Sequence, residues 1–440
     1  MNDQAVTDQC ADSCGWVANA GEYREFAALK GAQRADWVVI GGGFTGLAAA
    51  RRIAQMAPAA RVVLVDGKRI GQGASGRNSG FVVAHSTPDA GHFANARARA
   101  DYNALNALNR DGVSALKGLV TAQGIECQWE DTGTTYAVAG QQHFDRITQY
   151  AAGYDEIGVK TRVLEAADLA ARLGTAFYGH GLEVRGGALV QPAMLAKGLA
   201  ECLPPSVEVF ENTRVLGVDV EDGMGVVRCV GAVVRAPRVV VAVNGFLERL
   251  GLLPRRVFPL ALTASLTRVL NAREQAQMAD VESWGVLSPL SFGATLRWTK
   301  DRRIMIRNTA EYAPSGIGVD VLKRRRTVHL TGLSRRFPWL GKDAIEHTWS
   351  GNLGISRNSK PVFEAIDNTI FIAGCYNASG VARGTSMGRF IVDMALREPS
   401  DLLDRLRAIT PATRIPPRPF FDVGVRARLA MERWQGRGEG

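Results

Sequence analysis

The sequence predicts a mixed α/β fold, with one domain built on a parallel sheet and a second, α+β domain built on an antiparallel sheet. Three observations lead to this prediction. A strand, a glycine-rich turn and a helix follow one another near residue 40, and a second strand-to-helix unit lies near residue 370. Short stretches of alternating polarity, which are typical of antiparallel strands, lie between these two units. At 440 residues the chain is also too long for one hydrophobic core.

The composition is that of an ordinary globular protein with a basic charge balance. Hydrophobic residues make up 46% and charged residues 22%, and the 48 glycines exceed the roughly 30 expected from average usage, which indicates many tight turns. The formal net charge of +10 suits an anionic cofactor, an acidic substrate, a membrane surface or nucleic acid. The basic residues are scattered except for Lys323 to Arg326, a run that we interpret as a solvated helix face.

The cysteines and the first residues of the chain favour a cytoplasmic location. The six cysteines contain no Cys-x-x-Cys pair, and the N-terminus lacks the basic-then-apolar order of a signal peptide. Cys10 and Cys14 are too few for a zinc site, and the six histidines show no paired ligand spacing, so metal chemistry is unsupported. No apolar stretch approaches the roughly 20 residues that a membrane-spanning helix needs.

The turn near residue 40 has the pattern of a Rossmann-like dinucleotide-binding site. The apolar run Asp36 to Ile40 leads into Gly41-Gly-Gly-Phe-Thr-Gly46, and a helical stretch follows. Gly41 permits the turn, Gly43 lets the backbone approach a pyrophosphate, and Gly46 allows the helix to pack closely on the strand. The free N–H groups and the dipole at the helix N-terminus would then hold the phosphates.

A second strand supplies the acidic residue that such a site needs. Arg61 to Val65 is apolar and ends in Asp66, which lies 20 residues after Gly46 and is placed to accept hydrogen bonds from the ribose hydroxyls. A carboxylate there would repel the 2′-phosphate of NADP. At this point FAD and NAD both remain open.

Two further segments favour FAD over NAD. Gly71 to Gly80 combines glycines with small polar residues and is suited to wrap an extended anionic ligand, for which NAD folds have no use at this place. Far downstream, Thr369 to Gly374 is a second buried strand, and a helical stretch from Thr385 follows it. A helix N-terminus here would stabilise the negative charge at N1 and O2 of a reduced flavin.

With these motifs the sequence resembles the D-amino-acid oxidase-like FAD oxidoreductases, which include glycine and sarcosine oxidases, and within them the gamma-glutamylputrescine oxidase type. The resemblance covers roughly residues 34 to 400 and rests on the three glycine-rich segments, Asp66 and Trp349 to Gly351. It implies noncovalently bound FAD and a set of contacting residues. These are Gly41, Gly43, Phe44, Thr45, Gly46, Asp66, Ser75, Arg77, Asn78, Ser79, Val215, Gly380 and Val381.

Noncovalent binding of FAD is expected because this sequence lacks a cysteine that some relatives have. Some sarcosine oxidase-like relatives hold FAD through a cysteine shortly before the final strand, but Ser350 to Asp367 contains none. Cys375 comes directly after that strand. It is interpreted as a small packing residue, with a thiol that contacts the flavin ring as the alternative.

The predicted domains are interleaved in the sequence. The FAD-binding domain takes residues 34–90, 190–250 and 346–400. The substrate domain, which includes a helical insert, takes residues 91–189 and 251–345. An N-terminal extension (1–33) and a C-terminal tail (401–440) flank them. The antiparallel strands of the substrate domain are expected at Thr134 to Val138, Gly181 to Leu189, Leu262 to Val269 and Ile304 to Asn308.

The resemblance implies oxidation of a small primary or secondary amine or amino acid. A hydride passes from the carbon that bears the nitrogen to flavin N5, and water hydrolyses the imine. The nitrogen must be neutral, which agrees with the lack of a catalytic triad or paired carboxylates in the sequence. Oxygen or a quinone-linked carrier would reoxidise the flavin. The candidate residues on the substrate side are His85, Arg307, Tyr312, Trp349 and Arg383.

Two other functions are considered as alternatives. The chain is basic and related domains occur in tRNA-modifying proteins, but it has no aromatic-rich basic module, so no nucleic acid is expected as a partner. A redox-inactive FAD-binding subunit is the other alternative.

The C-terminal tail begins with the proline-rich Arg414 to Pro419, and Val423 to Trp434 mixes apolar residues with arginines. It would either dock onto the protein body or make a peripheral, basic amphipathic membrane contact.

Overall fold

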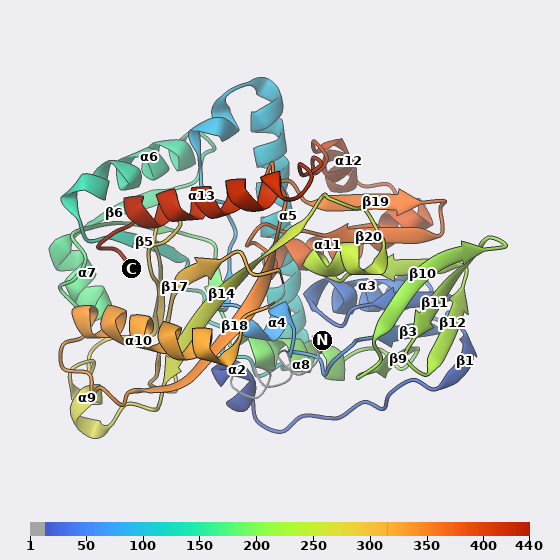
Figure 1. The fold of residues 1–440 in the computed structure, drawn as a ribbon, viewed down its shortest axis with the longest axis horizontal. Coiled ribbons are helices and arrows are strands. Elements are labelled where there is room, and N and C mark those ends of the chain that lie inside the picture. Colours follow the sequence, from blue (N-terminus) through green and yellow to red (C-terminus); the bar gives the residue numbers. More distant parts are fainter. Residues whose placement is uncertain (1–13, 315) are drawn as a thin grey trace.

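The computed structural model describes residues 14–314 and 316–440, and in it the chain forms two lobes around different sheets. In Figure 1 the lobe with the parallel sheet lies on the right and the lobe with the antiparallel sheet on the left. The predicted mixed α/β fold is confirmed. Cys10, which the sequence analysis considered as a metal ligand, lies outside the described residues.

The first lobe is built on a six-stranded sheet whose strand order is β19-β20-β13-β2-β3-β9. The pairs β13–β2, β13–β20, β2–β3 and β3–β9 are parallel, and β19 is antiparallel to β20. The strands are β2 (Trp37–Ile40), β3 (Val62–Val65), β9 (Val207–Phe210), β13 (Arg238–Val241), β19 (Val362–Ile366) and β20 (Ile370–Gly374).

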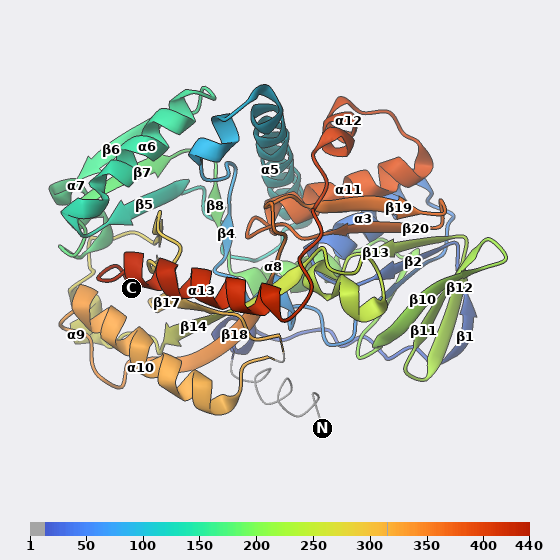
Figure 2. The same ribbon diagram turned by 45° about the horizontal axis from the view of Figure 1, so that its top comes forward.

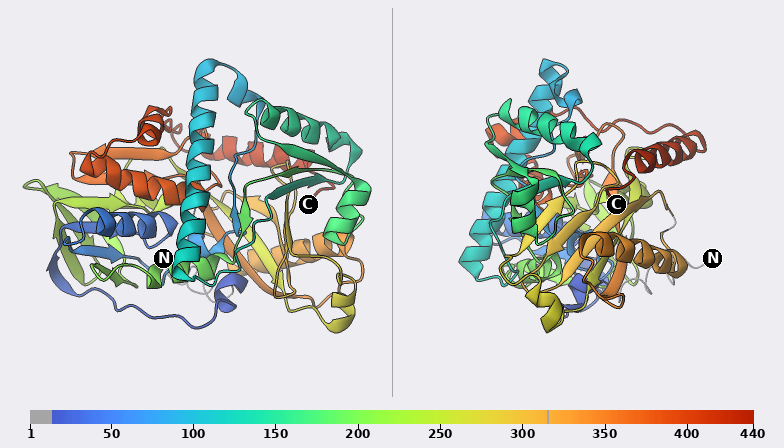
Figure 3. Two further views of the ribbon diagram at one scale, coloured as in Figure 1. Left: turned by 180° about the vertical axis from the view of Figure 1, so that it is seen from behind. Right: turned by 90° about the vertical axis from the view of Figure 1, so that its left-hand side faces the viewer.

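Both faces of this sheet are covered, which explains why its central strands are apolar at every position. Val39 and Leu64 face one hydrophobic cluster, while Val38 and Val63 face another. Alternate residues of a strand point to opposite faces, so a strand covered on both sides needs apolar residues throughout. Three helices cover the first face: α3 (Phe44–Met56), α5 (Ala96–Gln123) and α11 (Ala382–Leu396). Figure 3 shows α5 from behind, beside α3 and α11.

A four-stranded sheet covers the second face. Its order is β1-β12-β11-β10, with β1 (Gly31–Arg34), β10 (Val215–Glu221), β11 (Met224–Cys229) and β12 (Ala232–Ala236). β1 pairs in parallel with β12, so the end of the predicted N-terminal extension is part of this lobe.

The second lobe is an eight-stranded sheet of order β18-β14-β17-β16-β15-β5-β7-β6, in which β15 and β5 form a parallel pair. The strands are β5 (Thr134–Val138), β6 (Thr161–Glu165), β7 (His180–Val184), β14 (Phe258–Thr267), β15 (Trp284–Leu287), β16 (Thr295–Trp298), β17 (Ile304–Glu311) and β18 (Ile345–Ile355). The predicted boundary at residue 346 falls at the start of β18. This strand pairs with β14, so residues 345–355 belong to the sheet of the second lobe.

The expected strand from Gly181 to Leu189 is two strands in the structure. The first part lies in β7, while β8 (Ala188–Leu189) pairs with β4 (Phe81–Val82) in a separate two-stranded sheet. Gly186 separates the two strands with φ of +95°, which glycine adopts readily. The chain therefore turns between the two strands instead of extending in one.

Further helices complete the two lobes. They are α2 (Gly15–Ala18), α4 (Ala74–Arg77), α6 (Phe144–Asp155), α7 (Ala166–Leu173), α8 (Pro192–Glu201), α9 (Ala272–Ala276), α10 (Val319–Arg336), α12 (Asp401–Ala408) and α13 (Phe420–Gln435). Helix α10 covers one face of the eight-stranded sheet, where its residue Leu322 packs on Ala261 of β14. In the C-terminal tail, α13 crosses to the second lobe, as Figure 2 shows.

Candidate functional site

The glycine turn lies between β2 and α3 and needs glycine for steric reasons. Gly41 has φ of +102°, and a Cβ there would stand 2.7 Å from the carbonyl oxygen of Ala242. A Cβ on Gly46 would stand 1.8 Å from the carbonyl oxygen of Gly41. The backbone is therefore packed too tightly for side chains, and α3 begins at Phe44 directly behind the turn. This leaves a helix N-terminus at the carboxyl edge of the parallel sheet, which is where such folds bind phosphates.

Asp66 follows β3 and contacts the same turn. Its Oδ2 accepts a hydrogen bond from the backbone N–H of Gly42 at 2.7 Å, and its Oδ1 accepts one from the N–H of Lys68 at 2.8 Å. Burial raises the pKa of Asp66 to about 6. The carboxylate thus shapes the glycine turn, and it has lone pairs left to accept hydrogen bonds from ribose hydroxyls. The backbone N–H of Thr213 donates to the carbonyl oxygen of Asp66 at 2.8 Å, which brings the start of β10 and Val215 beside it.

The loop Gly71–Gly80 closes over the start of α3. Ser75 Oγ accepts a hydrogen bond from the N–H of Phe44 at 3.1 Å, so the loop contacts the helix N-terminus. Asn78 accepts from the N–H of Gly80 at 2.8 Å and donates to the carbonyl oxygen of Ser75 at 2.6 Å. In the structure Asn78 therefore maintains the shape of the loop. Whether it also contacts FAD stays a prediction.

Two residues from the second lobe hold this loop in place. The indole N–H of Trp349 donates to the carbonyl oxygen of Arg77 at 3.0 Å, and Arg77 donates to the carbonyl oxygen of Ser350 at 2.9 Å. Arg297 on β16 donates to the carbonyl oxygen of Ser79 at 3.3 Å. Arg297 was not among the predicted site residues, because the sequence around an arginine in a short strand does not indicate which distant residues it contacts.

The N-terminal segment also supports the loop. The ring of Trp16 lies edge-on to that of Trp349, with centroids 6.2 Å apart, and the Arg297 guanidinium lies 5.3 Å from the centre of the Trp16 ring. Gln191 donates to the carbonyl oxygen of Trp16 at 2.7 Å. The sequence analysis treated this segment as an extension, yet it forms part of the packing beneath the candidate FAD site.

The third glycine-rich segment, after β20, approaches the glycine turn from the other side. Thr45 donates from its hydroxyl to Tyr376 Oη at 2.5 Å, and Tyr376 in turn donates to the carbonyl oxygen of Ala373 at 3.0 Å. Tyr376 was not among the site residues predicted from the sequence. Gly380 lies against this tyrosine, since a Cβ there would come within 3.3 Å of the ring, and Val381 is the residue before α11.

Cys375 is buried at the start of this segment. Burial raises the pKa of its thiol to about 12, and its backbone N–H donates to Asn244 Oδ1 at 3.0 Å. A neutral, buried thiol agrees with the packing role predicted for it.

The residues proposed for the substrate side lie in different surroundings. Arg307 is half-buried on β17 opposite Thr295 of β16, and it donates to the Thr295 hydroxyl. Thr295 and Arg297 point to the same face of β16, and Arg297 reaches the loop at Ser79. Arg307 therefore lies on the sheet face that is turned toward the FAD loop. Burial lowers its pKa to about 10, so it stays charged near neutral pH.

Arg383, in contrast, is fully buried and its donors are engaged within the protein. It donates to Asn109 Oδ1 at 3.1 Å, to the carbonyl oxygen of Tyr376 at 3.0 Å and to Ser86 Oγ at 2.7 Å. These contacts join α11 to α5 and to the chain after β4. Its geometry is that of a residue that positions the loop after β20.

Three further candidates have partners elsewhere. Tyr312 donates to Asp422 of α13 at 2.6 Å, and Trp349 supports the loop through Arg77. His85 packs edge-on to Tyr154 with ring centroids 6.3 Å apart, and burial lowers its pKa to about 4, so it is neutral near pH 7. The structure thus does not gather the five candidates into one cluster, and their roles toward substrate stay predictions.

The helix N-terminus behind a glycine turn, the acid after the neighbouring strand and the wrapping loop define the class of dinucleotide-dependent oxidoreductases with a separate substrate sheet. Positions 41 and 46 have no space for a side chain, and Asp66 presents acceptors, so the residues fit FAD. Residues 36–394 match the protein family described as FAD dependent oxidoreductase (DAO). The chain belongs to this family, which confirms the resemblance and identifies the protein as an FAD-dependent oxidoreductase.

Individual relatives extend over most of the chain. Probable oxidoreductase OrdL from Rhizobium meliloti (strain 1021) is 24% identical over 432 residues, which cover 94% of each chain. Gamma-glutamylputrescine oxidoreductase from Escherichia coli (strain K12) is also 24% identical, over 86% of this chain and 88% of that protein. Among solved structures, glycine oxidase from Geobacillus kaustophilus superimposes with a TM-score of 0.72 at 18% identity, covering 88% of this chain and 100% of that one.

Proposed function

We propose that the protein oxidises a small primary or secondary amine or amino acid that carries a carboxylate, forming an imine that water then hydrolyses. When bound, FAD supplies the acceptor for a hydride from the carbon that bears the nitrogen. The observation that carries the proposal is Arg307, a charged residue on the sheet face turned toward the FAD loop. Among the described residues, no carboxylate forms an ion pair with it.

Arg307 has the chemistry to orient such a substrate. A guanidinium presents several N–H donors in a planar fork, and the Thr295 hydroxyl engages only one terminal nitrogen. The remaining donors are suited to a bidentate contact with a carboxylate, which would fix the distance between the reacting carbon and the flavin. Arg383 lacks this freedom because three of its donors are engaged within the protein.

The charges near Arg307 also favour a reactive amine. His329 of α10 lies on the other side of the sheet, and burial lowers its pKa to about 3, so this histidine is neutral near pH 7. A nearby cation raises the cost of a protonated amine and lowers the pKa of that amine. The names of the relatives, glycine oxidase and gamma-glutamylputrescine oxidoreductase, agree with an amine that carries a carboxylate.

An anaerobic screen of amines, amino acids and 2-hydroxy acids tests this proposal through bleaching of the oxidised flavin band. Amines with a carboxylate are expected to bleach the flavin. Bleaching by hydroxy acids alone would contradict the amine assignment. No bleaching by any of these compounds would favour a redox-inactive subunit or a function on RNA.

The carboxylate contact has its own test. Arg307→Lys is expected to raise KM about 10- to 100-fold for carboxylated amines, because one charge-assisted contact contributes about 1.5 to 3 kcal/mol. Amines without a carboxylate should show little change. Arg273→Lys, at an exposed residue of α9, is the matched control and should leave both substrates unaffected.

A further inference from the structure

Helix α13 has two opposite apolar faces, and only one of them is covered by the protein. On the covered face Phe421, Val425 and Leu429 pack on β14 and β17. On the other face four large apolar side chains are exposed. Their exposed fractions are 78% for Phe420, 66% for Val423, 53% for Met431 and 64% for Trp434. At 100° per residue these four positions form a single stripe opposite the buried face, which we call the outer stripe.

The charges on α13 are sorted in the same way. Its two acids lie on the inner side, where Asp422 accepts a hydrogen bond from Tyr312 and Glu432 pairs with Arg428 at 2.8 Å. Arg426 is exposed beside the outer stripe, and Arg433 flanks it from the same side. The exposed surface of this helix is therefore apolar along its centre and cationic along one edge.

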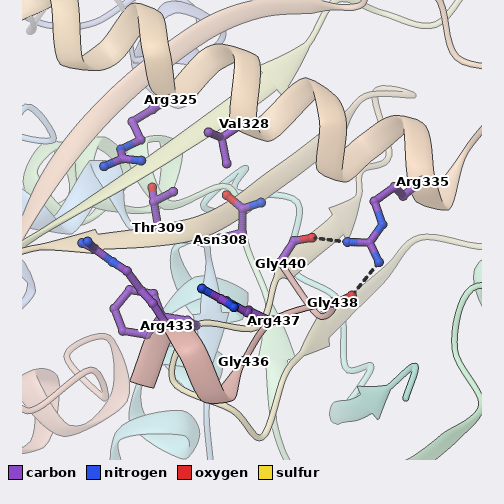
Figure 4. Close-up of a pocket in the computed structure, with 11 residues that line it drawn as sticks. Asn308, Thr309, Arg325, Val328, Arg335, Arg433, Gly436, Arg437, Gly438 and Gly440 are labelled. Carbon is purple, nitrogen blue, oxygen red and sulfur yellow. Dashed lines mark hydrogen bonds between the residues drawn. The ribbon is translucent and has the colours of Figure 1, made fainter. Parts of the chain in front are cut away.

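A cationic pocket lies next to the stripe, between α13 and α10. It has a volume of about 260 Å³, and four arginines contribute to its lining, as Figure 4 shows: Arg325, Arg335, Arg433 and Arg437. Arg325 pairs with Glu311, but its Nε is buried without a hydrogen-bond partner. Arg335 donates to the carbonyl oxygen of Gly438 at 2.8 Å. Two carboxyl groups, those of Glu311 and of Gly440, face the four guanidinium groups, so the pocket keeps an excess of positive charge.

Helix α10 covers the opposite face of the eight-stranded sheet from α13, because Ala261 of β14 packs against α10 while Leu260 and Leu262 pack against α13. Lys323 and Arg324 are exposed on the outside of α10, in the basic run noted in the sequence. In Figure 1 strands β14 and β17 lie between α13 and α10, so these two charges do not border the outer stripe. Among the described residues, no helix is long and apolar enough to cross a membrane. Any membrane contact of this surface would thus be peripheral.

We propose that the surface formed by the outer stripe of α13, the arginines along its edge and the arginine pocket binds an anionic phospholipid bilayer. The pocket would accept a headgroup phosphate, because guanidinium groups pair bidentately with phosphate oxygens. The four apolar side chains would enter the boundary between headgroups and acyl chains, as in other helices that lie in the membrane plane. A second copy of the chain fits this surface poorly, because pairing two outer stripes would bring two rows of arginines together.

The test uses the FAD-loaded, full-length protein and sedimentation with lipid vesicles. Vesicles of phosphatidylcholine with about 30% phosphatidylglycerol are expected to bind the protein at least tenfold more strongly than phosphatidylcholine alone. Each basic residue near an anionic surface should contribute about fivefold to partitioning, and 0.5 M salt should release the protein. Trp434 should be quenched by brominated lipid, because it lies in the outer stripe.

Variants separate the membrane contact from folding and from turnover. Phe420→Ser with Trp434→Ser should reduce vesicle binding about tenfold or more, and Arg426→Gln with Arg437→Gln should remove the preference for anionic lipid. Leu216→Ser is the matched control, because Leu216 is 55% exposed on β10, outside this surface, and should leave binding unchanged. FAD content and circular dichroism report folding.

Three outcomes would overturn the proposal. The first is no binding to anionic vesicles at low salt, and the second is equal binding by the wild type and the Phe420/Trp434 variant. The third is a wild type that does not bind lipid but forms oligomers that this variant does not form, as measured by ultracentrifugation. Vesicle binding is measured without substrate, so its failure would leave the proposed amine oxidation intact, and the reverse also holds.

Discussion

The indole N–H of Trp349 on β18 donates a hydrogen bond of 3.0 Å to the carbonyl oxygen of Arg77 in the loop between β3 and β4. This bond joins the sheet of the second lobe to the loop that closes over the start of α3. The side chain of Arg77 returns the contact by donating to the carbonyl oxygen of Ser350 at 2.9 Å. The candidate FAD site is thus held by both lobes.

Trp349→Phe is expected to weaken FAD binding while largely keeping the packing. The substitution removes the indole N–H and leaves the partly buried carbonyl of Arg77 without this partner, which should cost about 1 to 3 kcal/mol. FAD titration of the apoprotein and thermal unfolding measure the two effects. Trp339→Phe is the control, since Trp339 packs on Phe337 away from the loop. Equal effects of the two changes would argue that the Trp349 hydrogen bond is unimportant.

FAD should be released by acid precipitation. The segment Ser350 to Asp367 contains no cysteine, and Cys375 is buried with a pKa raised to about 12, so it is a poor nucleophile for a covalent bond. The absorbance of the supernatant after precipitation measures the released flavin. Flavin that stays in the pellet of the wild type but not of Cys375→Ser would show that this cysteine is linked to it.

Asp66→Ala is expected to lower FAD affinity by one or two charge-assisted hydrogen bonds, each contributing about 1.5 to 3 kcal/mol. The loss should exceed that of Asp36→Ala, an acid at the start of the same sheet that accepts a hydrogen bond from the N–H of Arg61 at 2.7 Å. FAD retained on gel filtration is the measurement. Unchanged retention would mean that another residue holds the ribose.

The pKa of Asp66 also predicts a pH dependence. This carboxyl has a pKa of about 6 in the folded protein, above its ordinary value of 3.8, so the folded apoprotein binds the proton more tightly than the unfolded chain. The apoprotein should therefore gain stability from this group as pH falls from about 6 to 4. FAD affinity should change in the opposite direction, because a protonated carboxyl accepts ribose hydrogen bonds less well. In Asp66→Asn both dependences should be lost, which thermal unfolding and flavin titration across this range would check.

Arg383→Lys should differ from Arg307→Lys in what it changes. Arg383 holds Ser86, Asn109 and the carbonyl oxygen of Tyr376, and a lysine would keep at most part of these contacts. We expect a lower melting temperature and weaker FAD retention, with the ratio of KM for carboxylated and uncarboxylated amines unchanged. A selective rise in KM for carboxylated amines would instead make Arg383 the substrate ligand.

The nucleotide-binding unit could be predicted because its signals are local. Gly41 and Gly46 lie within one turn, and the steric reasons for glycine there act over a few residues. The strands before and after this turn are apolar at every position because both faces of the sheet are buried. The substrate side could not be predicted in this way. Arg307 and Arg383 look alike in the sequence, and the partner that distinguishes Arg383, Ser86, lies 297 positions away.

The sequence by itself therefore determined the cofactor class and the mixed α/β fold, since turns, strands and the acid spacing are properties of short segments. Only the tertiary structure decided which side chains support the site and which remain available for a ligand. Trp16 and Arg297 became part of the site through contacts between distant segments. Likewise, the amphipathic character of α13 is local, but β14 and β17 decide which of its faces is buried and which is left exposed, because burial depends on the surface that the rest of the fold presents.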